Sequence, residues 1–251
     1  MKQNLTKSVA GLLLLLSFVA CQRTWVASPT LETTDVPVAK YIPEDPKLAE
    51  QIEPYKKEVT TKMSEIIGNA PVVLGKADYQ SPLGNFVVDL MLEEARERYK
   101  GPIDLATTTN GGLRVPIPLG AVSVGNIFEL MPFENELVVL TLKGQDVQEF
   151  FNIAAEAKYA PIANATYTVK DEKAINIKIG DKPFDPTQNY NIVTSDYLAG
   201  GGDNLGVFKR AIKSEKVGIM MRDAIMEHIR ELTAKGQPIG ADTTQRVIIL
   251  P

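Results

Sequence analysis

Three short segments of this sequence combine residue types that suit the binding of a small, partly anionic ligand. The first, residues 110–114, has the sequence Asn-Gly-Gly-Leu-Arg and follows a predicted strand. Adjacent glycines Gly111 and Gly112 let backbone N–H groups converge on an anion, and Arg114 adds a fork of donors that suits phosphate or carboxylate. A plain glycine turn with a surface arginine is the alternative, and for this pattern alone it is the commoner outcome.

The other two segments each place an aromatic ring near a polar side chain at the end of a predicted strand. Phe133 lies close to Asn135, and Tyr197 shortly precedes Gly202 and Asp203. Two aromatic rings on separate loops can clamp a planar base by stacking, worth about 1–3 kcal/mol per base. Asn135 and Asp203 could then satisfy the polar edges of the base or the hydroxyls of a ribose. Each aromatic residue taken alone is more commonly a core residue.

The residue inventory argues against several kinds of chemistry. The chain has 1 histidine, His228 in a predicted helix, and 1 cysteine, Cys21. A metal site built on histidine or cysteine is therefore not expected, and no nucleophile elbow, P-loop or dinucleotide fingerprint is present. The net charge of −4 argues against polynucleotide binding. We expect no catalytic residue, no metal and no cofactor in this chain.

Taken in order, these segments resemble the C-terminal domain of the bacterial 5′-nucleotidases, the family of periplasmic 5′-nucleotidase/UDP-sugar hydrolases. The resemblance runs from about Gly68 to Leu250, and any one motif in it is weak, but six in the same order and spacing are specific. These are Pro82-Leu83-Gly84-Asn85, Asn110-Gly111-Gly112-Leu113-Arg114, Gly120 with Val124, Pro132-Phe133-Glu134-Asn135, Lys143-Gly144, and Tyr197 through Asp203.

The resemblance implies a role for each residue of the predicted site. Phe133 and Tyr197 would sandwich the base, Asn135 and Asp203 would contact base or ribose, and Arg114 would reach the phosphate side. The full predicted substrate site is Asn110, Gly111, Gly112, Arg114, Phe133, Asn135, Tyr197, Gly202 and Asp203. The family usually has one or two basic residues just before the Leu-Gly-Asn segment. Here Ala77 stands where an arginine is expected, with Lys76 beside it.

In that family, catalysis belongs to a separate N-terminal metallophosphoesterase domain that carries two metals, and we expect this domain to be absent here. The first hypothesis is therefore a split hydrolase of nucleotide catabolism, in which this protein supplies the nucleotide-binding half. Divalent metals are then expected only on a separate partner phosphoesterase. A stand-alone nucleoside- or nucleotide-binding module and a degenerate scaffold without catalysis are the alternatives.

The N-terminus has the form of a bacterial lipoprotein signal. Lys2 and Lys7 precede an apolar run that includes leucines 12–16, and Phe18-Val19-Ala20-Cys21 resembles a lipobox. Residues 1–20 are predicted to be a signal peptide and Cys21 to be lipidated, followed by a tether over 21–42. We expect a protein of the bacterial cell envelope, held by its lipid anchor in the outer membrane and facing the periplasm.

The rest of the chain, 43–251, is predicted to be a single α+β domain with a mixed sheet flanked by helices. Apolar spacing of three and four predicts helices over 45–67 (a linker helix), 82–99, 122–130, 146–157 and 217–232. Alternating or continuous apolar runs predict strands over 71–74, 103–106, 136–142, 167–170, 174–179, 190–194 and 246–250, with a turn at 182–186.

Overall fold

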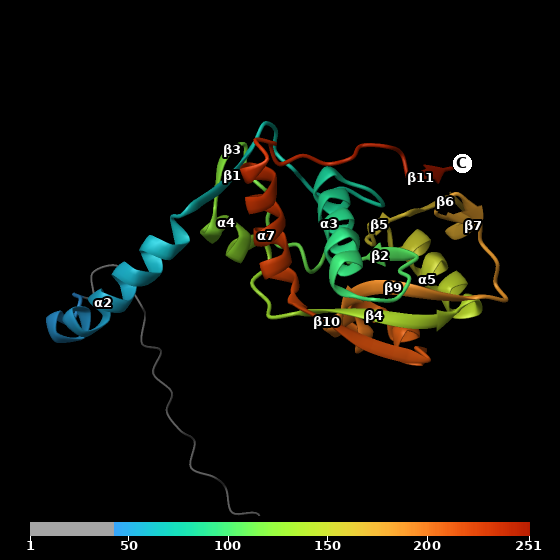
Figure 1. Cartoon of the computed structure of the whole chain (residues 1–251), viewed down its shortest axis with the longest axis horizontal. Coiled ribbons are helices and arrows are strands. Elements are labelled where there is room, and N and C mark those ends of the chain that lie inside the picture. The colour runs from blue at the N-terminus through green and yellow to red at the C-terminus, as the bar shows by residue number, and fades with distance from the viewer. Residues whose placement is uncertain (1–42) are drawn as a thin grey trace, which may run out of the picture. The chain divides into compact units, whose positions relative to one another are not determined.

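The computed structural model describes residues 43–251 (Figure 1). The predicted signal peptide, Cys21 and the predicted tether lie outside the described residues. Residues Glu50–Pro251 form one compact unit. Helix α2 (Pro46–Met63) begins before this unit, and every later element belongs to it. Among the described residues, no helix is both long and apolar enough to cross a membrane.

The strands of the described residues form three sheets. A five-stranded sheet has the order β10 (Lys213–Met220), β4 (Glu136–Lys143), β9 (Asn189–Ser195), β2 (Leu105–Thr107) and β5 (Ile162–Ala163). A four-stranded sheet has the order β11 (Val247–Ile249), β6 (Ala165–Lys170), β7 (Lys173–Ile179) and β8 (Lys182–Pro183), and β1 (Ile66–Ala70) pairs with β3 (Gly120–Ser123). In the five-stranded sheet β2 is parallel to β9, whereas the other pairs are antiparallel, so the sheet is mixed.

The helices that follow α2 are interspersed among these strands. They are α3 (Pro82–Arg98), α4 (Val124–Leu130), α5 (Gly144–Ala157), α6 (Asp196–Ala199) and α7 (Met221–Ala234), with short 3-10 helices η1 (Gly202–Asn204) and η2 (Gly206–Arg210). The predicted α+β class with a mixed sheet and flanking helices is confirmed. Ser123 caps α4, since its hydroxyl accepts a hydrogen bond from the Asn126 backbone N–H.

Three predicted elements near the two-stranded β1–β3 sheet have wrong bounds. The first predicted helix runs to residue 67, but α2 ends at Met63, and the predicted strand over 71–74 lies later than strand β1. The helix predicted from residue 122 starts at Val124, because residues 120–123 pair with β1 as strand β3. A Cβ on Gly68 would lie 2.6 Å from Ile229 Cγ2, so β1 packs closely on α7 through this glycine. Contacts of this kind, between segments far apart in the chain, do not produce a repeat of apolar residues within β1, so the sequence does not reveal the strand.

The predicted helix over 217–232 is also wrong at its start. Residues up to Met220 form strand β10, which pairs antiparallel with β4, and α7 begins only at Met221. Val217 and Ile219 are both buried, in the alternation expected of a strand. Strand β10 is followed at once by α7. The two-residue repeat of buried side chains in the strand therefore continues into the three- and four-residue repeat of the helix, and the sequence shows no boundary between them.

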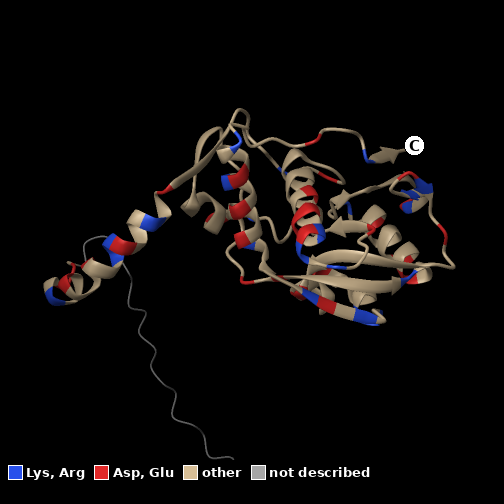
Figure 2. Cartoon of the chain, viewed as in Figure 1, with Lys and Arg blue, Asp and Glu red and all other residues tan. Residues whose placement is uncertain are grey.

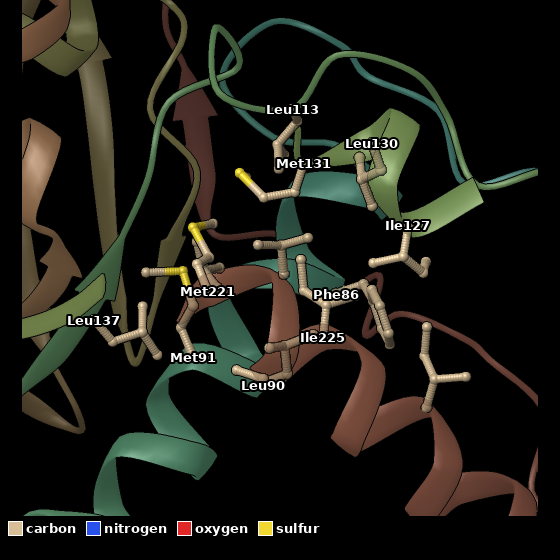
Figure 3. Packing of buried hydrophobic residues seen from close by; sticks show 14 of the residues in the cluster. Phe86, Leu90, Met91, Leu113, Ile127, Leu130, Met131, Leu137, Met221 and Ile225 are labelled. Atoms are coloured by element: carbon tan, nitrogen blue, oxygen red, sulfur yellow. The ribbon is translucent and has the colours of Figure 1, made fainter. Parts of the chain in front are cut away.

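Buried apolar side chains form two clusters. In the first, Phe86, Leu90 and Met91 from α3 lie near Met221 and Ile225 from α7 (Figure 3). The second cluster joins α5, the five-stranded sheet and the four-stranded sheet. Within it the ring centroids of Phe150 on α5 and Phe208 on η2 are 5.2 Å apart. This packing fixes the segment 202–210 that follows β9 and contributes to the site described below.

Helices α3 and α7 carry many acidic side chains (Figure 2), and one of them is buried. The Glu94 side chain is only 3% exposed, and its carboxylate pairs with Arg98, which also binds Glu227 at 2.6 Å. Burial raises the pKa of Glu94 above its ordinary value of 4.5, although the charge of Arg98 opposes that rise. The folded protein therefore holds this proton to a higher pH than the unfolded chain does.

A Glu94→Gln substitution is expected to flatten the dependence of stability on pH. Because the folded pKa of Glu94 is raised, its stabilising contribution is complete below about pH 4.5 and is lost as the pH rises through the folded pKa. The free energy of unfolding of the wild type, minus that of the variant, should decrease from pH 4.5 to pH 7. Urea unfolding across this range measures it, with Glu156→Gln, an exposed position of α5, as the control. A constant difference would contradict the prediction.

Candidate functional site

The topology of the five-stranded sheet brings the three predicted site segments to one end. Strands β4 and β9 are antiparallel, with Leu137 opposite Ser195, so the loop before β4 lies beside the residues after β9. Strand β2 is parallel to β9, so the loop that follows β2 also leaves the sheet at this end. The loop before β4 carries Phe133, the segment after β9 carries Tyr197, and the loop after β2 carries Arg114.

A cavity of about 240 Å³ lies where these segments meet, and it is lined by Gly111, Gly112, Arg114, Phe133, Asn135, Tyr197 and Asp203. The structure thus brings together seven of the nine predicted site residues. The side chains of Phe133 and Tyr197 are not core residues, since they are 40% and 52% exposed. Two large aromatic rings that line one cavity and stay in contact with solvent are suited to stacking on a planar ligand.

The two remaining predicted residues support the cavity without lining it. Asn110 donates from Nδ2 to the backbone oxygen of Ala77 at 3.0 Å. A Cβ on Gly202 would lie 2.4 Å from the Tyr197 ring, so a glycine at this position lets the ring approach the backbone closely. Lys76, beside Ala77, donates to the backbone oxygens of Leu113 at 2.7 Å and of Asn110 at 3.4 Å. Lys76 therefore secures the glycine loop.

Within the described part of the chain, Asp203 is the one carboxylate that lines the cavity, and neighbouring side chains fix it in place. Its backbone is left-handed, with φ +49°, which is uncommon for a residue other than glycine. The carboxylate accepts hydrogen bonds from the hydroxyl of Tyr197 at 3.0 Å and from that of Thr109. The hydroxyl of Tyr159 donates to the Asp203 backbone oxygen at 2.6 Å, and burial raises the pKa of Tyr159, which keeps this donor protonated.

Comparison with known proteins identifies the family of this domain. Residues 65–210 match the family description "5′-nucleotidase, C-terminal domain". The chain belongs to this family. It is 27% identical over 228 residues to the trifunctional nucleotide phosphoesterase protein YfkN of Bacillus subtilis, covering 81% of this chain and 15% of YfkN. It is 25% identical over 213 residues to protein UshA of Yersinia enterocolitica, covering 81% of this chain and 37% of UshA.

A solved structure shows the same fold. The crystal structure of the 5′-nucleotidase precursor from Thermus thermophilus superposes with a TM-score of 0.70 and 25% identity, covering 83% of this chain and 44% of that one. The chain therefore spans less than half the length of each of these relatives. The resemblance to the 5′-nucleotidase C-terminal domain drawn from the sequence motifs is confirmed.

In this 5′-nucleotidase C-terminal domain, Asp196 connects the two aromatic segments. Its Oδ1 accepts hydrogen bonds from the backbone N–H of Tyr197 at 2.8 Å and from that of Glu136 at 3.2 Å. Glu136 lies three residues after Phe133 and also pairs with Lys216 at 2.6 Å. One carboxylate oxygen thus holds the backbone that follows Phe133 and Asn135 to the backbone that carries Tyr197.

Arg222, at the start of α7, supports the other side of the Phe133 loop. Its guanidinium lies over the Phe128 ring at 4.2 Å, and its Nη1 is 3.4 Å from the backbone oxygen of Phe133. The backbone N–H of Met221 also donates to the backbone oxygen of Asn135 at 2.8 Å. The start of α7 therefore positions both Phe133 and Asn135.

Arg114 is the residue that the sequence predicts on the phosphate side of a ligand. In the structure Arg114 lines the cavity, and its Nη1 donates to the backbone oxygen of Gly111 at 3.0 Å. The arginine thus braces the glycine loop while its remaining donors can face a ligand. Among the lining residues that the structure describes, it is the one cationic side chain, and Asp203 offsets its charge.

No group of three or more His, Cys, Asp or Glu side chains in residues 43–251 is arranged to hold a metal ion. His228 lies between α7 and α3, where its ring meets Phe86 edge-on with centroids 5.8 Å apart. Its Nδ1 is 3.8 Å from a carboxylate oxygen of Glu93, and burial lowers the pKa of the imidazole. These contacts are those of a packing residue at a helix interface.

Proposed function

We propose that this domain binds the nucleoside part of a nucleotide, with the base stacked between Phe133 and Tyr197. The observation that carries the proposal is the pair of half-exposed aromatic rings that line one small cavity together with Asn135 and Asp203. Asn135 offers an amide that can both donate and accept toward a base edge, and Asp203 offers a carboxylate to sugar hydroxyls. Arg114 provides donors on the phosphate side.

We also propose that hydrolysis takes place on a separate metallophosphoesterase, so that this chain acts as the substrate-binding half of a split hydrolase. The support is the family match, since residues 65–210 match the 5′-nucleotidase C-terminal domain and the relatives YfkN and UshA are longer than this chain. Divalent metals would then belong to the partner, where they would activate the attacking water and stabilise the phosphate.

Helix α2 offers a surface for such a partner. Leu48, Ile52, Tyr55 and Val59 recur along it at spacings of four, three and four, and all are exposed, with Tyr55 at 72%. No residue of the helix is buried, and it contains Pro54. Most of the stability of a helix in a protein comes from packing of its apolar face, so burial of this apolar stripe by a partner would stabilise α2.

We further propose that the protein is anchored in the bacterial cell envelope through a lipid on Cys21. Processing before Cys21 and acylation of its thiol would place the domain at the membrane surface, where a partner phosphoesterase could meet it. Mass spectrometry of the protein purified from membranes tests this. An acylated N-terminal peptide that begins at Cys21 is expected, and an unmodified Cys21 within a longer peptide would refute the anchor.

Calorimetric titration with adenosine and with AMP, without added metal, tests the binding function. We expect both ligands to bind, and AMP to bind more tightly if Arg114 contacts its phosphate. AMP hydrolysis by a cognate phosphoesterase is then measured with and without this protein. Binding that leaves hydrolysis unchanged would favour a stand-alone binding module. Absence of both binding and any effect on hydrolysis would favour a degenerate scaffold.

Removing the Asp196 carboxylate is expected to loosen both aromatic segments. In Asp196→Ala the backbone N–H groups of Tyr197 and Glu136 lose their acceptor. Adenosine binding should weaken roughly 3- to 10-fold, which corresponds to about 1 kcal/mol in total. Asp196→Asn keeps an oxygen in the same place and should recover most of the affinity. Equal affinities of the alanine variant and the wild type would show that this bridge does not position the rings.

A further inference from the structure

The carboxylate of Asp203 already has two hydrogen-bond donors from the protein before any ligand enters the cavity. Oδ2 accepts from the Thr109 hydroxyl, and Oδ1 accepts from the Tyr197 hydroxyl at 3.0 Å. A carboxylate offers about four lone-pair positions in all, two on each oxygen. Half of this capacity is therefore used within the protein.

One of the two Asp203 carboxylate oxygens, Oδ2, is shielded from the cavity. A Cβ on Gly111 would lie 2.8 Å from Oδ2 of Asp203, so the backbone of the glycine loop lies directly against this oxygen. With Gly111 against it and Thr109 bonded to it, Oδ2 has little room for a ligand hydroxyl. Oδ1, which shares its bond with Tyr197, is the oxygen that can accept one more donor.

The hydroxyl of Tyr197 is held where it is by the packing of its ring. The ring lies against Gly202, whose Cβ position would fall 2.4 Å from ring atoms Cε1 and Cζ. The backbone N–H of Tyr197 is tied to Asp196, and the Asp203 backbone oxygen is tied to Tyr159. Both partners of the Tyr197–Asp203 hydrogen bond are thus fixed independently of the bond itself.

We propose that the Tyr197 hydroxyl occupies a position at Asp203 that a second sugar hydroxyl would otherwise take, so that this site accepts ribonucleosides and 2′-deoxyribonucleosides alike. The inference rests on the proposed function, since it presumes that a nucleoside binds with its sugar toward Asp203. One hydroxyl of the sugar, such as the 3′-hydroxyl that both classes carry, satisfies the free position on Oδ1. The second hydroxyl of a ribose has no acceptor left on this carboxylate and adds little affinity.

The test compares adenosine, 2′-deoxyadenosine and 2′,3′-dideoxyadenosine by calorimetric titration of the complete chain and of its Tyr197→Phe variant. For the wild type, adenosine and 2′-deoxyadenosine should bind within about twofold of each other. The dideoxy compound should bind about tenfold more weakly, because a hydrogen bond to a charged group is lost. The phenylalanine variant keeps the ring but frees a position on Oδ1, so its preference for adenosine over 2′-deoxyadenosine should rise to about tenfold.

Tyr99→Phe is a matched control, because the hydroxyl of Tyr99 also donates to a carboxylate, that of Glu215, outside the cavity. This variant should keep the wild-type ratios. A wild type that already prefers adenosine about tenfold over 2′-deoxyadenosine overturns the inference without any variant. An unchanged ratio of adenosine to 2′-deoxyadenosine affinity in Tyr197→Phe overturns the inference as well. In either case the proposed function still holds if nucleoside binding depends on Phe133. Absence of binding by all three nucleosides overturns both.

Discussion

Replacing Phe133 with alanine is expected to weaken adenosine binding by about 5- to 150-fold, which corresponds to the roughly 1–3 kcal/mol that one aromatic ring contributes to stacking on a base. The ring lines the cavity and is 40% exposed, so it can stack on a ligand without being part of the hydrophobic core. For the same reason the free energy of unfolding should change by less than about 1 kcal/mol. A loss of affinity without a loss of stability is the expected signature of a ligand contact.

Calorimetric titration with adenosine measures the first quantity, and urea unfolding measures the second. Ile212→Ala is a matched control, because Ile212 is an exposed large apolar residue, at 55%, that does not line the cavity. That variant should bind adenosine like the wild type. Equal affinities of Phe133→Ala and the wild type would show that the cavity does not stack a base on this ring, and the sandwich would have to be abandoned.

The site could be predicted from the sequence because its lining residues lie in short segments with distinctive composition. Phe133 with Asn135, and Tyr197 with Asp203, each sit a few residues apart at a strand end, so one local motif brings an aromatic ring and a polar group together. Parallel and antiparallel pairing of β2, β9 and β4 then places these strand ends side by side. Once the strands are identified, the convergence of the segments follows from the topology.

The residues that position the site could not be found in this way. Thr109 lies 94 positions before its partner Asp203, and Tyr159 lies 44 before it. Asp196 reaches back 60 positions to Glu136, and nothing around these residues in the sequence signals such contacts. Thr109 adjoins a predicted motif, which is a weak hint, but Tyr159 has none. Hydrogen bonds between distant segments depend on the folded backbone, which the local pattern of residues does not encode.

The same limit explains the misplaced elements near residues 66–74 and 213–220. Strand β1 is held by its pairing with β3 and by contact of Gly68 with α7, and strand β10 by its pairing with β4. Helices α3 and α5, whose apolar faces repeat over several turns, match their predicted ranges nearly in full. Elements whose stability is local can therefore be recovered from the sequence, while short strands that depend on distant partners cannot.

One buried arginine, Arg246, forms the main side-chain network between the C-terminal segment and the rest of the domain. The Arg246 side chain is 8% exposed, and it donates to the backbone oxygen of Ile162 at 2.7 Å and to Oδ2 of Asp89, on α3, at 2.6 Å. A weaker contact of 3.4 Å joins it to Asp242, and its backbone N–H donates to the side chain of Gln80 at 2.7 Å. Arg246 directly precedes β11, the strand that pairs with β6, so this network joins the end of the chain to α3 and β5.

Replacing Arg246 with methionine is expected to lower the free energy of unfolding at neutral pH by about 3 kcal/mol, because removing one partner of a buried pair leaves the other charge without its counter-ion. Breaking a buried ion pair usually costs about 3–5 kcal/mol. The loss should lie at the lower end of this range, because the Asp89 side chain is 39% exposed and keeps some contact with water. Arg230→Met is the matched control: Arg230 is 44% exposed and pairs with Glu65 at 2.9 Å, and an exposed pair of this kind contributes about 0–1 kcal/mol. Urea unfolding of both variants measures the difference. Equal losses in the two would mean that the Arg246 network is no more than a surface ion pair, and that pairing of β11 with β6 alone anchors the C-terminal segment.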